Sequence, residues 1–291
     1  MVKFRKTISL LTLCIIILSF IAASYGILSD NGNGQYEYKS IHGKTISIYG
    51  KGLYKNDSVS VASQAIAQDI VTIILGIPLL IISLYLSRKG LIKGRLLLTG
   101  TLGYFLYTYT SYSFLSMYNS LFLIYVMLMS LSFFAFTLAM MSFDIQDLSL
   151  YFDEKLPVKF LGCFLIFIAF SIGMMWLGRI VPSLINNTLP NGLEHYATLV
   201  IQALDLGFLV PTGIISGILV IKKKAIGYLL ASVVIIKSIT MLSAITAMII
   251  GQIHVGIKVN FVEIVLFPLF NLLVIYCMTL IMKSVKEPRY E

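Results

Sequence analysis

Long apolar runs, separated by short polar stretches, repeat along the whole chain. Each run is close to the length of a bilayer-crossing helix, which takes roughly 20 residues, and the runs lack the strict alternation of transmembrane β-strands. Because a helix satisfies its own backbone hydrogen bonds within hydrocarbon, the pattern predicts an all-α transmembrane bundle of eight helices. We place these helices near residues 7–28, 67–87, 96–117, 121–142, 160–180, 197–221, 225–250 and 262–282.

Two polar segments are long enough to have structure of their own. Residues 29–66 open with the turn-rich SDNGNGQ and then alternate polar and apolar residues between glycines, which predicts a small β-hairpin-like loop. Residues 143–159 predict a short amphipathic helix at the membrane surface. The expected organisation is a first helix (1–28), the hairpin loop (29–66), helices two to four (67–142), the surface loop (143–159), helices five to eight (160–282) and a tail (283–291).

Composition and charge agree with a membrane protein. Hydrophobic residues make up 58% of the chain and charged residues 12%, about half the charged fraction of a soluble domain. The net charge of +9 would suit a nucleic acid only if it formed one basic surface, and it does not. Of the 22 Lys and Arg residues, 15 fall in alternate connections, namely Lys3, Arg5, Lys6, Arg88, Lys89, Lys93, Arg95, Lys155, Lys159, Lys222, Lys223, Lys224, Lys283, Lys286 and Arg289.

This asymmetry is the positive-inside signature. It predicts a multi-pass protein of the cell membrane with both termini in the cytoplasm, the lipid bilayer as its partner and no nucleic-acid partner. The first apolar run also resembles a secretory signal peptide that ends near Ala22-Ala23-Ser24. Its length, from Ile8 to Ile27, favours retention, and cleavage would leave seven spans.

The second and sixth predicted spans, each with the helix that follows it, share an order of features. Each has a carboxylate near its outer end, an internal proline, a basic turn and then a glycine; these are Asp69, Pro78 and Gly94 in one, and Asp205, Pro211 and Gly227 in the other. Aligning the two glycines places Tyr104 opposite Lys237. The pattern predicts two four-helix repeats related by an axis along the membrane normal, as in many transporters. Chance similarity between apolar helices is the alternative.

Lys237, in SVVIIKSITM, is the most informative single residue. A charge at the bilayer centre costs about 3 kcal/mol or more, and at 1.5 Å per residue Lys237 is about 18 Å from either end of its span, too deep to reach the surface. Asp205 lies about 12 Å down the neighbouring span. We therefore predict a Lys237–Asp205 ion pair, which either locks two helices together or lines a water-accessible binding or proton-relay site.

Further polar residues are expected in the same outer half. Tyr104, Tyr107 or Thr108, and Ser111 recur at helical spacing and predict a polar stripe that faces the bundle interior. Tyr104, Arg179 and Asp69 are predicted as additional lining of a binding site around Lys237. As an alternative, four residues supply ligand types that zinc accepts, although their spacing matches no known zinc motif: Glu194, His195, His254 and Glu263. No cofactor is expected.

The segments YGKGLYKNDSV, LLLTGTLGYFLYTY and LDLGFLVPTGIISGILVIKKKAIGYLL resemble those of an uncharacterised group of multi-pass bacterial membrane proteins. The resemblance covers most of the chain and implies its topology class alone. The residues themselves favour a transporter-like protein, or a binding subunit, for a small solute, ion or lipid. Two other hypotheses stay open, a non-catalytic membrane scaffold and a membrane enzyme at the outer leaflet acting through Asp69, His195, His254 and Glu263.

Overall fold

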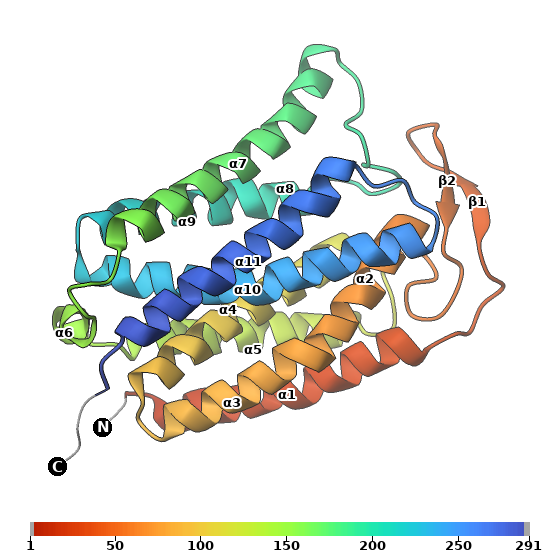
Figure 1. Cartoon of the computed structure of the whole chain (residues 1–291). Helices are drawn as coiled ribbons and strands as arrows, with labels where there is room; N and C mark the ends of the chain where they lie inside the picture. Colours follow the sequence, from red (N-terminus) through yellow and green to blue (C-terminus); the bar gives the residue numbers. More distant parts are fainter. Residues whose placement is uncertain (1–2, 288–291) are drawn as a thin grey trace.

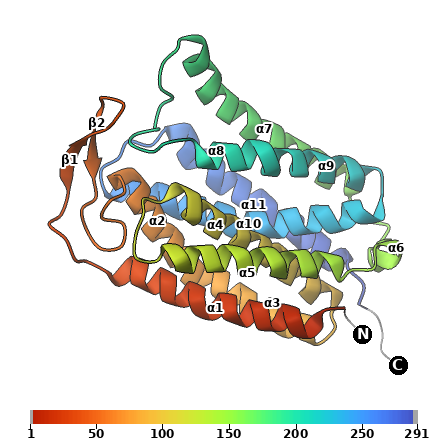
Figure 2. The same cartoon turned by 180° about the vertical axis from the view of Figure 1, so that it is seen from behind.

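Eight long helices form an all-α bundle in the computed structural model, which describes residues 3–287 (Figure 1). A small antiparallel hairpin lies at one end of the bundle, which we call the hairpin end, and both chain termini lie at the other, the tail end (Figure 2). The helices are α1 (Arg5–Leu28); α2 (Val59–Val71), which continues through a π-helical turn (Thr72–Gly76) into α3 (Ile77–Arg88); α4 (Ile92–Leu115); α5 (Phe122–Met141); α7 (Val158–Ile185); α8 (Val200–Leu204), which continues through a second π-helical turn (Asp205–Leu209) into α9 (Val210–Ile221); α10 (Ala225–His254); and α11 (Phe261–Ser284).

Seven of these described helices are long and apolar enough to cross a membrane, so the chain is a polytopic membrane protein. The eighth, α4, is more polar because it carries many Thr, Ser and Tyr residues, yet it fills the position of the predicted third span. It packs against α3, α5 and α10 at the centre of the bundle. Protein rather than lipid surrounds α4, and its hydroxyl groups can therefore find partners there.

The hairpin loop is shorter than the predicted segment 29–66. Strands β1 (Tyr36–Lys39) and β2 (Thr45–Ile48) pair with Tyr36 opposite Ile48, which confirms the hairpin. However, α2 begins at Val59, where the Ser58 hydroxyl accepts a hydrogen bond from the Val61 amide at 3.2 Å. Residues 59–66 are thus helical, because their polar face packs against α10 instead of facing water.

The prediction of one amphipathic surface helix over residues 143–159 is wrong. The segment holds a single turn, α6 (Ile145–Leu148), followed by a 3₁₀ turn (Ser149–Tyr151). Leu148, Phe152 and Leu156 are buried in the bundle while Leu150 is exposed, and Phe152 stacks on Tyr228 with ring centroids 4.9 Å apart. The segment is also tied to the chain after α11, since the Lys286 amide donates to the Tyr151 carbonyl at 2.7 Å.

The predicted internal repeat is present in the backbone. The two π-helical turns begin at residues 72 and 205, the helices after them at 77 and 210, and the next helices at 92 and 225, so that each pair is 133 residues apart. A β-carbon added at Gly94 would collide with the backbone of Leu86, and one added at Gly227 with the backbone of Leu219, again with the same offset. The two helical hairpins therefore close in the same way.

The remaining helices complete two halves with the same order of elements. We call residues 5–141 the first half and residues 158–284 the second half. Both α1 and α7 run from the tail end to the hairpin end, which makes the repeats parallel, and α4 and α10 pack against each other where the halves meet (Figure 1). The halves differ most at the hairpin end, where α2 has 13 residues but α8 has only 5.

Candidate functional site

The Asp205 carboxylate of the second half is bonded to side chains of two other helices. Its Oδ1 accepts a hydrogen bond from the Tyr107 hydroxyl at 2.6 Å, and its Oδ2 accepts one from Trp176 Nε1 at 2.8 Å. Tyr107 comes from α4 and Trp176 from α7. Asp205 is only 8% exposed, so these two bonds hold a buried carboxylate at the junction of three helical segments.

The backbone at Asp205 departs from a regular helix for an identifiable reason. The Val210 amide donates to the Asp205 carbonyl, a five-residue spacing, and Pro211 has no N–H to donate to the carbonyl four residues before it. The first half has the same arrangement, in which the Ile77 amide donates to the Thr72 carbonyl ahead of Pro78. Such π-helical turns occur frequently at functional sites.

Lys237 lies beside this carboxylate but does not contact it directly. Its Nζ is 4.1 Å from the centroid of the Tyr107 ring, and no Lys237–Asp205 ion pair within 4.0 Å is found in the described chain. The predicted direct ion pair is therefore wrong. Tyr107 stands between the two charged groups, with its hydroxyl on Asp205 and its ring face on the ammonium group.

The ammonium group of Lys237 is buried without a conventional partner. The residue is 9% exposed, and among residues 3–287 its Nζ has neither a hydrogen bond nor an ion pair. An ammonium group has three N–H donors. A cation–π contact is worth about 2 kcal/mol at best, while burying a charge costs several kcal/mol. The site can therefore accept a further polar or anionic group.

Tyr104 and Asp69 belong to a different cluster, in the first half, and do not line a space around Lys237. The Tyr104 hydroxyl accepts from Gln68 Nε2 at 2.7 Å and lies 3.0 Å from the Thr72 hydroxyl. Asp69 accepts from the hydroxyl groups of Tyr54 at 2.6 Å and Tyr112 at 3.1 Å.

Asp69 is also not at a helix N-terminus, because α2 begins ten residues earlier. By the 133-residue offset, Tyr104 corresponds to Lys237 and Thr72 to Asp205. The first half thus has neutral groups where the second half has charges.

Arg179 contacts Trp176, which in turn is bonded to Asp205. Its guanidinium carbon lies 5.8 Å from the centre of the Trp176 ring system, and its Nε donates to the Asn191 carbonyl at 2.5 Å. Arg179 therefore binds the loop that follows α7 and contacts the tryptophan that holds Asp205, and within the described residues it has no hydrogen bond or ion pair with Asp205 itself.

The four residues of the alternative metal site are not gathered together. In the described part of the chain, no group of three or more His, Cys, Asp or Glu side chains is placed to hold a metal ion. His195 Nε2 lies 3.1 Å from the Asn56 carbonyl, His254 is exposed at the end of α10, and Glu263 is in the first turn of α11. Glu194, beside His195, has a left-handed backbone in the loop after α7.

A polar latch at the hairpin end was not predicted. Asp57 Oδ1 accepts hydrogen bonds from the Met117 amide and the Tyr196 hydroxyl, both at 3.0 Å, and the Ser58 amide donates to the Tyr196 oxygen at 3.3 Å. These contacts join the start of α2 to the loop before α8. Burial raises the pKa of Asp57 to about 6.

Sequence reasoning missed Tyr107 and Trp176 as functional residues. Tyr107 was on the predicted polar stripe, which was the available signal, but the stripe does not tell which tyrosine meets Asp205. Comparisons of the chain with protein families, with curated proteins and with solved structures give no match. The resemblance to multi-pass bacterial membrane proteins therefore stays a prediction.

Proposed function

We propose that this membrane protein is transporter-like, or is a binding subunit, and takes a small solute or ion at Lys237, Tyr107 and Asp205. One observation carries the proposal: the Lys237 ammonium group is buried with no hydrogen bond or ion pair among the described residues, while the nearby carboxylate has both oxygens occupied. An ionisable residue inside a membrane bundle is by default a functional one.

Stability alone gives little reason to keep these charges. Buried charged groups are often replaced by apolar residues of similar volume with no loss of stability, or with a gain. Lys237 also stands where the first half has Tyr104, whose neutral hydroxyl is satisfied by Gln68 and Thr72. The same backbone position is therefore compatible with a neutral side chain, and the charge in the second half supports a role in binding.

The chemistry of the site favours an anion, or a solute with an anionic group. The open donors are those of an ammonium group, and the ring of Tyr107, whose hydroxyl shares Asp205 with Trp176, lies against that group.

Access from the hairpin end, which we take to be the outer side, suits this site. Asp205 lies five residues after the start of α8, about 8 Å along the axis, whereas Asp69 lies ten residues into α2, about 15 Å.

A ligand panel tests the proposal. The purified protein in lipid nanodiscs is heated with small carboxylates, phosphate esters and halides, and its unfolding midpoint is measured. We expect at least one anion to stabilise the wild type, by about 2.7 kcal/mol when its concentration is a hundred times Kd. The variant Lys237→Met should lose this response.

Lys258→Met is the matched control, because it removes the same charge from an exposed position after α10. It should respond as the wild type does. An equal response in Lys237→Met would place the anion elsewhere. A flat response across the panel, together with a Lys237→Met variant less stable than the wild type, would favour the scaffold hypothesis instead.

A further inference from the structure

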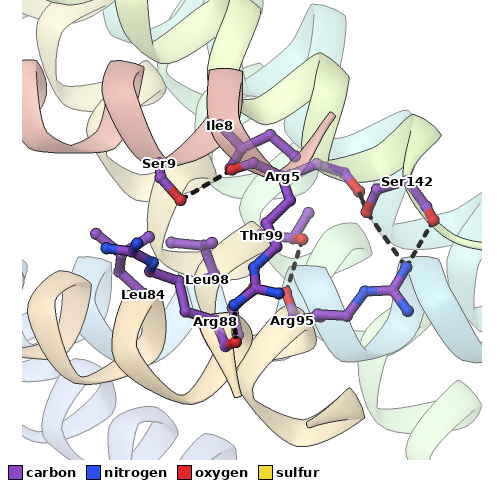
Figure 3. A pocket seen from close by; sticks show the side chains of 11 residues that line it. Arg5, Ile8, Ser9, Leu84, Arg88, Arg95, Leu98, Thr99 and Ser142 are labelled. Atoms are coloured by element: carbon purple, nitrogen blue, oxygen red, sulfur yellow. Dashed lines mark hydrogen bonds between the residues drawn. The ribbon is translucent and has the colours of Figure 1, made fainter. Parts of the chain in front are cut away.

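Three arginines meet around a hollow at the tail end, far from Lys237. The hollow is shallow and open to solvent, its enclosed part of about 10 Å³ is the size of one water molecule, and it lies between the ends of α1, α3, α4 and α5. Arg5 comes from α1, Arg88 from α3 and Arg95 from α4, and the Arg5 side chain extends between the other two (Figure 3). The rest of the lining mixes apolar and hydroxyl side chains, and no carboxylate is among the lining side chains of the described chain.

Part of this arrangement holds helix ends together. The Nη2 atom of Arg5 donates to the Arg88 carbonyl at the end of α3. The Nη2 atom of Arg95 donates to the Ser142 carbonyl after α5 at 2.6 Å. These bonds satisfy carbonyls that a helix leaves without partners. A guanidinium group has five N–H donors, however. Arg5 uses one of them, and the guanidinium of Arg88 has no hydrogen bond within residues 3–287.

The repeat shows that the fold itself does not require arginines here. At the 133-residue offset, Arg88 corresponds to Ile221 and Arg95 to Tyr228. The turn between α9 and α10 nevertheless closes with the same backbone bond as the turn between α3 and α4, from Lys224 to Leu219 at 3.0 Å and from Leu91 to Leu86 at 3.3 Å. Arg88 and Arg95 are therefore not needed to close the turn between two helices.

We propose that a phosphate group binds at the open mouth of this hollow. Phosphate matches several guanidinium donors at once, the side chains of Arg5 and Arg88 are exposed there, and within residues 3–287 no acidic side chain lines the hollow beside them. The hollow is at the end of the bundle where an anionic lipid presents its headgroup, and α1 and α3 contribute the apolar residues Ile8 and Leu84 to its lining. The lipid is therefore the favoured source, and a free phosphate is the other.

Two probes distinguish these sources. In the first arm, retention of phosphatidylglycerol is measured by native mass spectrometry after purification from mixed phosphatidylcholine and phosphatidylglycerol bilayers. In the second, inorganic phosphate or pyrophosphate is added to protein in neutral phosphatidylcholine nanodiscs, and the unfolding midpoint is followed. We expect Arg5→Gln with Arg88→Gln to weaken retention of phosphatidylglycerol about tenfold, which corresponds to about 1.4 kcal/mol.

The matched control is Lys6→Gln with Lys89→Gln. It removes two charges next to the tested arginines in sequence, from exposed residues that do not line the hollow. This variant should retain phosphatidylglycerol nearly as the wild type does, because general attraction to the surface is spread over many basic residues.

A response to phosphate or pyrophosphate that depends on Arg5 and Arg88 would support the phosphate site with a soluble ligand. Equal losses in the two double variants, or no dependence of either probe on the arginines, would overturn the proposal. If the glutamine variant fails to fold, Arg5→Lys with Arg88→Lys decides: it keeps the charge and loses the forked donors, and unchanged binding by a folded lysine variant would contradict a guanidinium site.

Discussion

The carboxylates of the two halves have different surroundings on nearly the same backbone. Asp69 precedes the first π-helical turn, is 3% exposed, and is bonded to two tyrosine hydroxyls. Asp205 begins the second π-helical turn, shares its surroundings with a lysine, and is held by one tyrosine and one tryptophan. A duplicated scaffold thus has one sealed cluster, in which the carboxylate is bonded to two hydroxyl groups, and one cluster in which a lysine has unused donors.

Packing explains why only one of them is sealed. In the first half, α1 runs along α2, α3 and α5 and covers the bulged helix. In the second half, α7 packs chiefly on α9 and leans away from the rest of the bundle toward the hairpin end (Figure 1). The α8 helix is also eight residues shorter than α2, and a loop replaces the missing turns. The second half therefore has fewer helical turns packed around its carboxylate than the first half has.

The largest effect is expected at Gly94 and Gly227, the closely packed glycines that the two halves share. Gly94→Ala and Gly227→Ala should each destabilise the protein by about 3 kcal/mol, because the new methyl group meets the backbone of the preceding helix and forces the two helices apart. Thermal or denaturant unfolding in nanodiscs measures the loss. Gly178→Ala is the control, since nothing lies within 4 Å of a β-carbon there, and it should be neutral or slightly stabilising.

Similar losses in the two variants would confirm that the hairpins are equivalent. A large loss in one half alone would show that the repeat is only apparent.

A smaller effect is expected at Asp69 and Asp205, the two carboxylates whose surroundings differ between the halves. Asp69→Asn and Asp205→Asn should each cost about 2 kcal/mol of stability, because an amide has one acceptor oxygen where the carboxylate has two, and a buried donor loses its partner. At pH 6, only Asp205→Asn should change the stabilisation by an anionic solute. The change should be an increase, since a negative charge close to the bound anion is removed. A similar change in Asp69→Asn would mean that the sealed cluster also communicates with the ligand.

The features predicted correctly from the sequence are those with direct backbone or solvation consequences. The lengths of the apolar runs predicted the helices. The Pro78/Pro211 and Gly94/Gly227 pairs predicted the internal repeat, because a proline and a closely packed glycine impose the same backbone geometry wherever they occur. The start of α2 at Val59 was missed, since its polar residues are buried against protein and not against lipid. The positions of Asp205 and Lys237 along their spans predicted that the two residues lie near each other. They could not show that Tyr107 stands between them, because the direction of side chains across a bundle depends on packing.

Tyr107 allows a finer test of the charged cluster. In a double-mutant cycle, Lys237→Met and Tyr107→Leu should be coupled by about 1.5 kcal/mol, as expected for a desolvated cation over an aromatic ring. Tyr107→Phe keeps the ring and loses only the bond to Asp205, so a cycle with Tyr107→Phe should show much weaker coupling. Unfolding free energies of the variants supply the measurement. Equal coupling in both cycles would assign the interaction to the hydroxyl group and not to the ring.

The smallest effect is expected at the Asp57 latch, where the two halves meet at the hairpin end. Burial raises the pKa of Asp57 from its ordinary 3.8 to about 6, so between these values the folded protein holds a proton that the unfolded chain has lost. Stability should therefore rise as the pH falls from 7 to 5, by about 1 kcal/mol. Asp57→Asn, which keeps an oxygen for the Met117 amide and the Tyr196 hydroxyl, should remove this dependence when midpoints are compared at the two pH values. The same pH dependence in Asp57→Asn would locate the titrating group elsewhere, and the latch would then join the halves without sensing pH.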